Sequence, residues 1–126
     1  MHGTEEDRER LAASAAGDEL LALLQDPSPR VVRALLGNRG LTEEDVLVLA
    51  ARKNLPGEAL DQIARDRRWT ESYPVRLALA KNPKTPLFSS LSIVRYLRLF
   101  DQAELTRSVA LPLVFRRKVA SIIIEK

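Results

Sequence analysis

The feature that most constrains this 126-residue chain is an internal repeat, in which residue types recur after a shift of about 44 positions. Repeats of this length hold two or three helices. A single unit cannot bury its own apolar stripe, so neighbouring units stack and share one core. The recurring positions are Ser28/Ser72, Val31/Val75/Val119, Ala34/Ala78/Ile122, Leu35/Leu79/Ile123, Asn38/Asn82, Leu47/Leu91, Leu49/Ile93, Ala50/Val94 and Ala59/Ala103.

Local signals along the chain indicate short helices. Thr4 with Asp7, Thr42 with Asp45, and Asp101 with Glu104 have the spacing of a helix N-cap and an acid three residues later. Prolines at positions 29, 56, 74, 86 and 112 each precede an apolar run of helical period, where the first helical turn tolerates them. No segment alternates with the period of two that strands show. The sequence predicts eight or nine helices, over Glu5–Ala16, Glu19–Gln25, Pro29–Leu36, Glu43–Arg52, Pro56–Arg65, Pro74–Lys81, Pro86–Leu97, Gln102–Ser108 and Pro112–Glu125.

Three asparagines, Asn38, Asn54 and Asn82, each follow an apolar helical run. Two structural interpretations are open. Either they end the helix in the left-handed conformation, or their side chains hydrogen-bond the turn that follows. Contact with a ligand is the functional alternative, and the structural interpretations are preferred to it.

Two stretches resemble units of the leucine-rich repeat variant family. They are Leu23–Leu35, which reads LLQDPSPRVVRAL, and Val75–Pro86, which ends in Asn-Pro-x-Thr-Pro. The resemblance covers about a third of the chain and implies a HEAT-like, right-handed superhelix with a scaffolding role. Some members of the family carry a cysteine-held Fe–S module. This chain has no cysteine, so that activity cannot be carried over.

These observations predict an all-α fold, a short right-handed helical-repeat solenoid of the HEAT/armadillo kind. We expect one domain over residues 1–126. Its parts would be N-terminal cap helices (1–27), two repeat units (28–71 and 72–111) and the start of a third unit (112–126).

Catalytic signatures are sparse in the sequence. The single histidine, His2, lies next to the start, and without cysteine there is no thiolate for a metal or a nucleophile. Phosphate-binding glycine motifs are missing. We therefore expect no enzyme activity, no cofactor and no small-molecule substrate. No apolar run approaches the roughly 20 residues of a membrane helix, and the start does not resemble a signal peptide, so we expect a cytoplasmic protein that does not enter a membrane.

Charge is distributed unevenly along the chain. Residues 1–63 carry seven Lys/Arg against twelve Asp/Glu, a net charge of −5, whereas residues 64–126 carry thirteen against five, a net of +8. Basic residues beside aromatics can grip phosphates and stack on bases, although a solvated face and a buried tryptophan are the plainer readings. The candidate binding surface consists of Arg65, Arg67, Arg68, Trp69, Arg76, Lys81, Lys84, Arg116 and Arg117.

The last predicted helix carries three consecutive isoleucines, Ile122, Ile123 and Ile124. They cover more than half of a helix circumference, and an exposed apolar patch usually indicates a partner. A homodimer through this end, a longer repeat array of which this chain is a part, or a helix folded back into the core would each explain them.

Two functions from different classes follow. The first is a non-catalytic interaction or scaffold module that presents a helical-repeat surface to a protein partner, or that self-associates through Ile122–Ile124. The alternative is a nucleic-acid-binding domain that uses the basic C-terminal half. Nucleic-acid binding should weaken steeply with salt, because phosphate contacts release counterions, whereas an apolar contact should not.

Overall fold

The computed structural model describes residues 3–125, and every regular element in this range is an α-helix. The fold is therefore all-α, as the helical periodicity predicts. The one helix that the sequence did not indicate is the single turn α6. The ten helices in the described range are α1 (Glu5–Ala12), α2 (Gly17–Leu23), α3 (Pro29–Leu36), α4 (Glu43–Ala51), α5 (Gly57–Arg65), α6 (Arg67–Thr70), α7 (Tyr73–Lys81), α8 (Leu87–Val94), α9 (Leu99–Arg107) and α10 (Leu113–Glu125).

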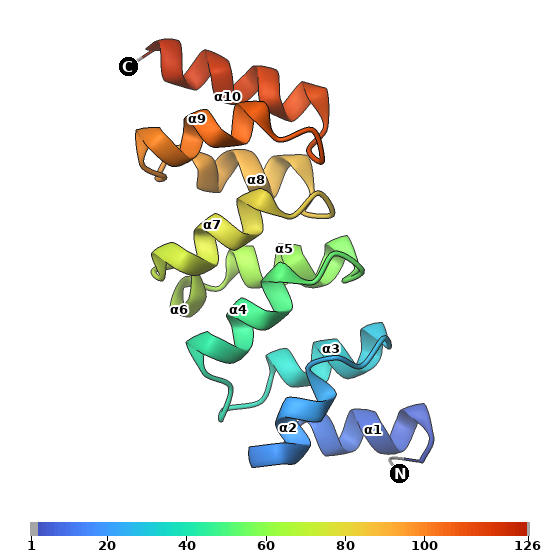
Figure 1. The fold of residues 1–126 in the computed structure, drawn as a ribbon. Coiled ribbons are helices and arrows are strands. Elements are labelled where there is room, and N and C mark those ends of the chain that lie inside the picture. Colours follow the sequence, from blue (N-terminus) through green and yellow to red (C-terminus); the bar gives the residue numbers. More distant parts are fainter. Residues whose placement is uncertain (1–2, 126) are drawn as a thin grey trace.

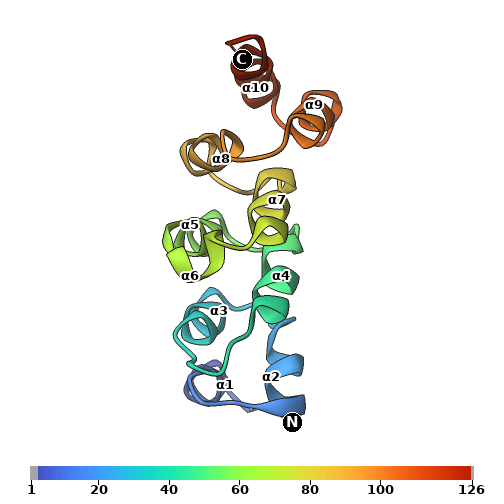
Figure 2. The ribbon, with the colours of Figure 1, turned by 90° about the vertical axis from the view of Figure 1, so that its left-hand side faces the viewer.

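The helices stack into an elongated column with α1 and α10 at opposite ends (Figure 1). Seen from the side, α1, α3, α5, α6 and α8 form a first layer, and α2, α4, α7 and α9 form a second layer (Figure 2). Within each layer a helix packs on the one before it, so that α3 contacts α1 and α5, α5 contacts α8, and α7 contacts α4 and α9. The helix α10 closes the column by packing on α9 and α8.

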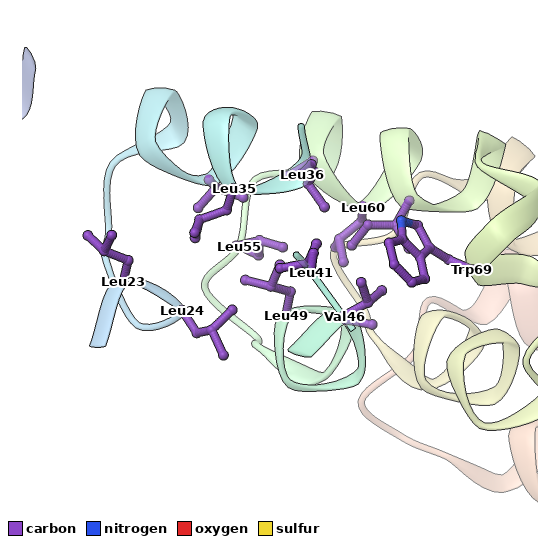
Figure 3. Close-up of a cluster of buried hydrophobic side chains, with 14 of the residues drawn as sticks. Leu23, Leu24, Leu35, Leu36, Leu41, Val46, Leu49, Leu55, Leu60 and Trp69 are labelled. Carbon is purple, nitrogen blue, oxygen red and sulfur yellow. The ribbon is translucent and has the colours of Figure 1, made fainter. Parts of the chain in front are cut away.

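Apolar side chains between the two layers form two hydrophobic clusters. The larger cluster extends from Ala12 to Ile93, and Figure 3 shows several of its leucines together with Trp69. The smaller cluster joins α8, α9 and α10 through residues such as Phe115 and Val119. Helix α7 contributes to both clusters, because Leu79 belongs to the larger one and its neighbour Ala80 to the smaller. Helix α7 therefore packs in both clusters and connects them.

Four of the turns between helices share one hydrogen-bonding pattern, which we call the repeated turn. A fully or almost fully buried leucine accepts a backbone N–H from the residue three positions later, at distances of 2.9–3.3 Å. Three positions further on, a leucine or threonine is buried, and the residue after it directly precedes the first residue of the next helix. The four examples are Leu35–Asn38–Leu41–Thr42, Leu49–Arg52–Leu55–Pro56, Leu79–Asn82–Thr85–Pro86 and Leu105–Ser108–Leu111–Pro112.

In three of these turns the side chain at the second position reaches back to the previous helix of the same layer. Each donates to main-chain carbonyls at the C-terminal end of that helix, where carbonyls lack partners within the helix. The bonds run from Asn38 Nδ2 to the Ala12 and Ala15 carbonyls (2.9 Å each), from Arg52 Nη1 to the Leu24 carbonyl (2.8 Å), and from Asn82 Nδ2 to the Ala50 and Arg52 carbonyls (2.8 Å each). Buried polar side chains therefore tie successive helices of each layer together.

The asparagines behave as one of the two structural interpretations predicts. Asn38 Oδ1 accepts the N–H of Gly40 at 2.7 Å, and Asn82 Oδ1 accepts the N–H of Lys84 at 2.9 Å, so both bond the following turn. The left-handed alternative is wrong, because every residue with positive φ in the described range is a glycine. Asn54 does neither, and its Oδ1 accepts from Arg52 Nε at 3.3 Å.

Two of the three predicted helix caps are confirmed. Thr4 and Thr42 each form a capping box, in which the hydroxyl accepts the N–H three residues on and the acid there accepts the threonine N–H. The third prediction, Asp101, is wrong. Helix α9 begins earlier, at Leu99, and Asp101 lies inside its first turn, where it accepts the hydroxyl proton of Tyr73.

The 44-residue shift matches local elements that are equivalent in structure. Ser28 and Ser72 are both N-caps, and each hydroxyl accepts an N–H three residues later at 3.3 Å. However, the shift superposes α3 on α7, and these helices lie in opposite layers (Figure 2). The smallest structural repeat is therefore one helix with its turn. The unit boundaries 28–71 and 72–111 stay predictions.

Candidate functional site

The structure places the nine predicted surface residues in three separate regions. Arg65, Arg67, Arg68, Trp69 and Arg76 lie on or beside α6, Lys81 and Lys84 lie at the end of α7, and Arg116 and Arg117 lie near the start of α10. Two members of the first group, Arg67 and Arg76, line one cleft. The sequence does not predict that Arg67 and Arg76 line the same cleft, because it does not indicate helix α6.

Two arginines of the first group are already paired within the chain. Arg65 Nε lies 2.9 Å from Asp61 Oδ2, and Arg68 Nη2 lies 2.8 Å from Asp66 Oδ2. The hydrogen bond from Arg68 holds the pKa of Asp66 below its ordinary value. A guanidinium that already has a carboxylate partner contributes little net charge to a ligand site.

Trp69 is a core residue, which settles the two interpretations left open by the sequence. Its side chain is 7% exposed and belongs to the larger cluster with Val46 and Leu60 (Figure 3). The guanidinium carbon of Arg68 lies 4.7 Å from the ring centroid and covers it from outside. Trp69 therefore offers no stacking surface to a nucleic-acid base.

The cleft lies between α5–α6 and α8 in the first layer, and we call it the α6–α8 cleft. Its volume is about 670 Å³, compared with about 290 Å³ for the cleft between α4 and α7 and about 120 Å³ for the one between α3 and α5. Its lining residues are Ala64, Arg67, Thr70, Glu71, Arg76, Ser92, Ile93 and Tyr96.

Arg76 is held in place at this cleft by main-chain and aromatic contacts. Its Nη1 donates to the Thr70 carbonyl at 2.7 Å, and its guanidinium carbon lies 5.2 Å from the centroid of the Tyr73 ring. The guanidinium carbon of Arg98 also lies over the Tyr73 ring, 4.2 Å from its centroid. Burial, together with the hydrogen bond to Asp101, raises the pKa of Tyr73, so its hydroxyl stays protonated at neutral pH. The neutral Tyr73 ring is therefore an aromatic platform that positions the Arg76 guanidinium.

The cleft is positively charged. Neither Arg67 nor Arg76 forms an ion pair with any residue that the structure describes, and Arg76 Nε is buried with no acceptor there. Glu71 is the one acid among the lining residues. Two arginines against one glutamate leave a net positive potential facing the opening.

One wall of the cleft is fixed by a bond between α5 and α8. Ser89 Oγ donates to Asp61 Oδ1 at 2.6 Å, and Ser89 is buried. Ser92 lies one helical turn further along α8 and faces the cleft. A part-buried hydrogen bond within the chain therefore joins α5 and α8 beside the cleft.

The remaining predicted basic residues lie apart from this cleft. Lys81 lines the cleft between α4 and α7 with Lys53 and Leu77, and Lys84 is exposed in the following turn. Arg116 Nε donates to the Leu111 carbonyl at 3.2 Å. Arg117 is exposed on the outer face of α10.

The three consecutive isoleucines of α10 are not equivalent. Ile122 is 6% exposed and packs in the smaller cluster, Ile123 packs partly against it, and Ile124 is open, at 83%, so the explanation by a helix packed into the core holds for the first two. Successive residues of a helix point about 100° apart, so Ile122 follows Phe115 and Val119 into the core. The outer face of α10 instead carries Leu113, Val114, Arg117, Lys118 and Ser121.

Within residues 3–125, no helix is long and apolar enough to cross a membrane, and no group of three or more His, Cys, Asp or Glu side chains could hold a metal ion. His2, the single histidine, lies outside the described residues.

Comparison with known proteins gave no match of the chain to a family model, to a curated protein or to a solved structure.

Proposed function

We propose that this protein is a helical-repeat interaction module, a short right-handed HEAT-like solenoid that binds a segment of a partner protein in the clefts between its stacked helices. Alternation of helices between two layers and the recurrence of one turn type support the repeat class (Figures 1 and 2). Such stacks present long surfaces to extended partners.

The observation that carries the proposal is the α6–α8 cleft, which combines unpaired cationic groups with apolar surface. Arg67 and Arg76 supply the charge, and Tyr96, with 72% of its side chain exposed, stands at the edge. Binding sites on proteins join an apolar lining to a few placed polar groups.

Exposed large apolar side chains gather in the same half of the molecule. Nine of the eleven in the described range follow residue 63, and groups of such residues usually mark interaction surfaces. Several border clefts, since Leu87 and Val114 line one at the α7–α8 turn and Tyr96 lines the α6–α8 cleft. The nine are Leu87, Phe88, Tyr96, Leu99, Phe100, Val109, Leu113, Val114 and Ile124.

The proposal can be tested by selecting peptides from a random library displayed on phage, with the folded protein immobilised. We expect enrichment of a shared sequence motif, whose synthetic peptide binds in solution and is displaced by the free protein. Failure to enrich any binding peptide from a library of linear and constrained peptides would count against a peptide-binding module.

Nucleic-acid binding is the second candidate, supported by the net charge of +8 over residues 64–126. Fluorescence anisotropy of labelled random DNA and RNA oligonucleotides, at low and moderate salt, separates it from the first. Binding that collapses as salt rises would favour phosphate contacts. Absence of binding even at low salt would remove this candidate.

A further inference from the structure

We propose that the α6–α8 cleft takes a carboxylate side chain of the partner segment, an Asp or Glu next to an apolar or aromatic residue. In this arrangement Arg67 and Arg76 bind the carboxylate, and Ile93 with Tyr96 contacts the neighbouring apolar group. The inference rests on the proposed function and specifies its ligand chemistry.

The choice of a carboxylate follows from the two arginines. A guanidinium presents a rigid fork of donors that matches the two oxygens of a carboxylate. Arg76 makes one hydrogen bond within the described residues, to the Thr70 carbonyl, and so keeps donors free. Because Tyr73 and Thr70 already fix its position, little side-chain freedom is lost when a ligand binds.

The apolar neighbour follows from the opposite part of the lining. Ala64 and Ile93 line the cleft between α5 and α8; Ile93 is 4% exposed, so most of the exposed apolar surface is the Tyr96 ring beside them, at 72%. An aromatic or branched side chain placed here would cover apolar surface that water now contacts, which is favourable in proportion to the area covered. The ligand therefore has two parts, one anionic and one apolar.

A protein acid fits this cleft better than a nucleic-acid strand. Two arginines and one glutamate in the lining give the cleft one net positive charge, which matches a single carboxylate better than a continuous row of phosphates. The neighbouring Arg65 and Arg68 are paired with Asp61 and Asp66 and so do not extend the positive surface. Bases would also find no platform in Trp69, which is buried.

The inference can be tested by NMR titration of the ¹⁵N-labelled protein with two capped dipeptides, acetyl-Phe-Glu-amide and acetyl-Phe-Gln-amide. They are similar in shape and differ in one charge. We expect the Glu peptide to shift amide signals of α6, the start of α7 and the end of α8. The Gln peptide should bind at least about fivefold more weakly, because it loses the ion pairs with both arginines, each worth up to about fivefold when exposed.

Four variants make the test specific. Arg67→Gln and Arg76→Gln should each weaken the Glu peptide by about fivefold and leave the Gln peptide unchanged. Arg65→Gln is the matched control, because it removes a positive charge nearby that is already paired with Asp61. Ser92→Glu places a carboxylate in the cleft without removing a core contact, and should compete with the peptide even where Arg76→Gln perturbs folding.

The results separate this inference from the function on which it rests. Equal binding of the two dipeptides, no shifts at the cleft, or equal losses from Arg65→Gln and Arg67→Gln would overturn the carboxylate site. If peptides selected from the random library nevertheless bind elsewhere on the protein, the interaction module stands without this site. If an oligonucleotide shifts the same signals and the Glu peptide does not, the cleft binds phosphate and the inference is wrong.

Discussion

The two halves of the stack differ in how they use their apolar residues. Both halves bury polar side chains that tie helices together, Asn38 and Arg52 in the front half (residues 3–63) and Asn82 in the rear half (residues 64–125). Of the buried apolar side chains in the described range, 17 lie in the front half and 12 in the rear half, whereas nine of the eleven exposed large ones lie in the rear half, where two arginines also stand unpaired at a cleft. The comparison indicates that more of the apolar core lies in the front half and most of the candidate binding surface in the rear half.

Charged contacts at the first helix add to the packing of the front half. Asp26 accepts from Arg8 Nε at 2.7 Å, and Arg30 bridges Glu5 and Glu9 on α1 at 3.2 and 2.6 Å. Three of the twelve acids of residues 1–63 therefore hold α1 to α3 and to the turn before it.

The largest effect is expected at the helix that joins the halves. Leu79→Ala removes a fully buried side chain from α7, which belongs to both clusters, and should cost about 2–5 kcal/mol of unfolding free energy. Urea denaturation measures it. Val48→Ala on α4, at 40% exposure, is the control and should change stability far less. A near-neutral Leu79→Ala would contradict the shared core.

Removal of an asparagine from the repeated turn should have the next largest effect. Asn82→Ala leaves the carbonyls of Ala50 and Arg52 without that donor and should cost about 2–3 kcal/mol, with Asn38→Ala similar. Thermal and urea unfolding of both variants would check this. Asn54→Ala, at an exposed asparagine, is the control. If Asn54→Ala were as damaging, the bonds between helices would not explain the effect.

A pH-dependent loss of stability is expected from Asp26. Burial raises its pKa, but hydrogen bonds from Arg8 and from the Ser28 N–H outweigh burial and hold the pKa below its ordinary value. Since the folded-state pKa lies below the unfolded one, this stabilisation is present above about pH 4 and is lost as the pH falls through the folded value.

Asp26→Asn should therefore cost about 1–2 kcal/mol at pH 7 and flatten the fall in stability on the acid side. Urea denaturation at a series of pH values compares the two proteins. A parallel pH profile in wild type and variant would show that another group is responsible.

The smallest effect on stability is expected in the rear half. Arg67→Ala removes an exposed side chain with no ion pair in the described chain, and should leave unfolding free energy within about 0.5 kcal/mol. The same variant should lose binding to selected acidic peptides. A large loss of stability with unchanged binding would reverse the roles assigned to the two halves.

The helices and much of the core could be predicted from the sequence, because caps and apolar periodicity are local signals. Thr4 and Thr42 are caps as their spacing predicts. The cleft could not be predicted, since it depends on α6, a single turn that places Arg67 opposite residues of α8.

The turn that contains Arg52 has a signal in the sequence that a 44-residue shift does not reveal. Arg52 occupies the position of Asn38 and Asn82, three residues after a leucine and three before another, but its different chemistry hid the match. The burial of Ile122 also follows from helical direction, because Ile122 lies seven residues after Phe115 and three after Val119, on the same face of α10.

The separation between a core centred on the larger cluster and a binding surface in the rear half can be tested by amide hydrogen exchange, measured with and without a peptide selected from the random library. We predict that the amides slowest to exchange lie in α3, α4 and α7. The peptide should slow exchange only in α5 to α8. Slowest exchange in α8 to α10, or peptide protection centred on α1 to α3, would contradict the account.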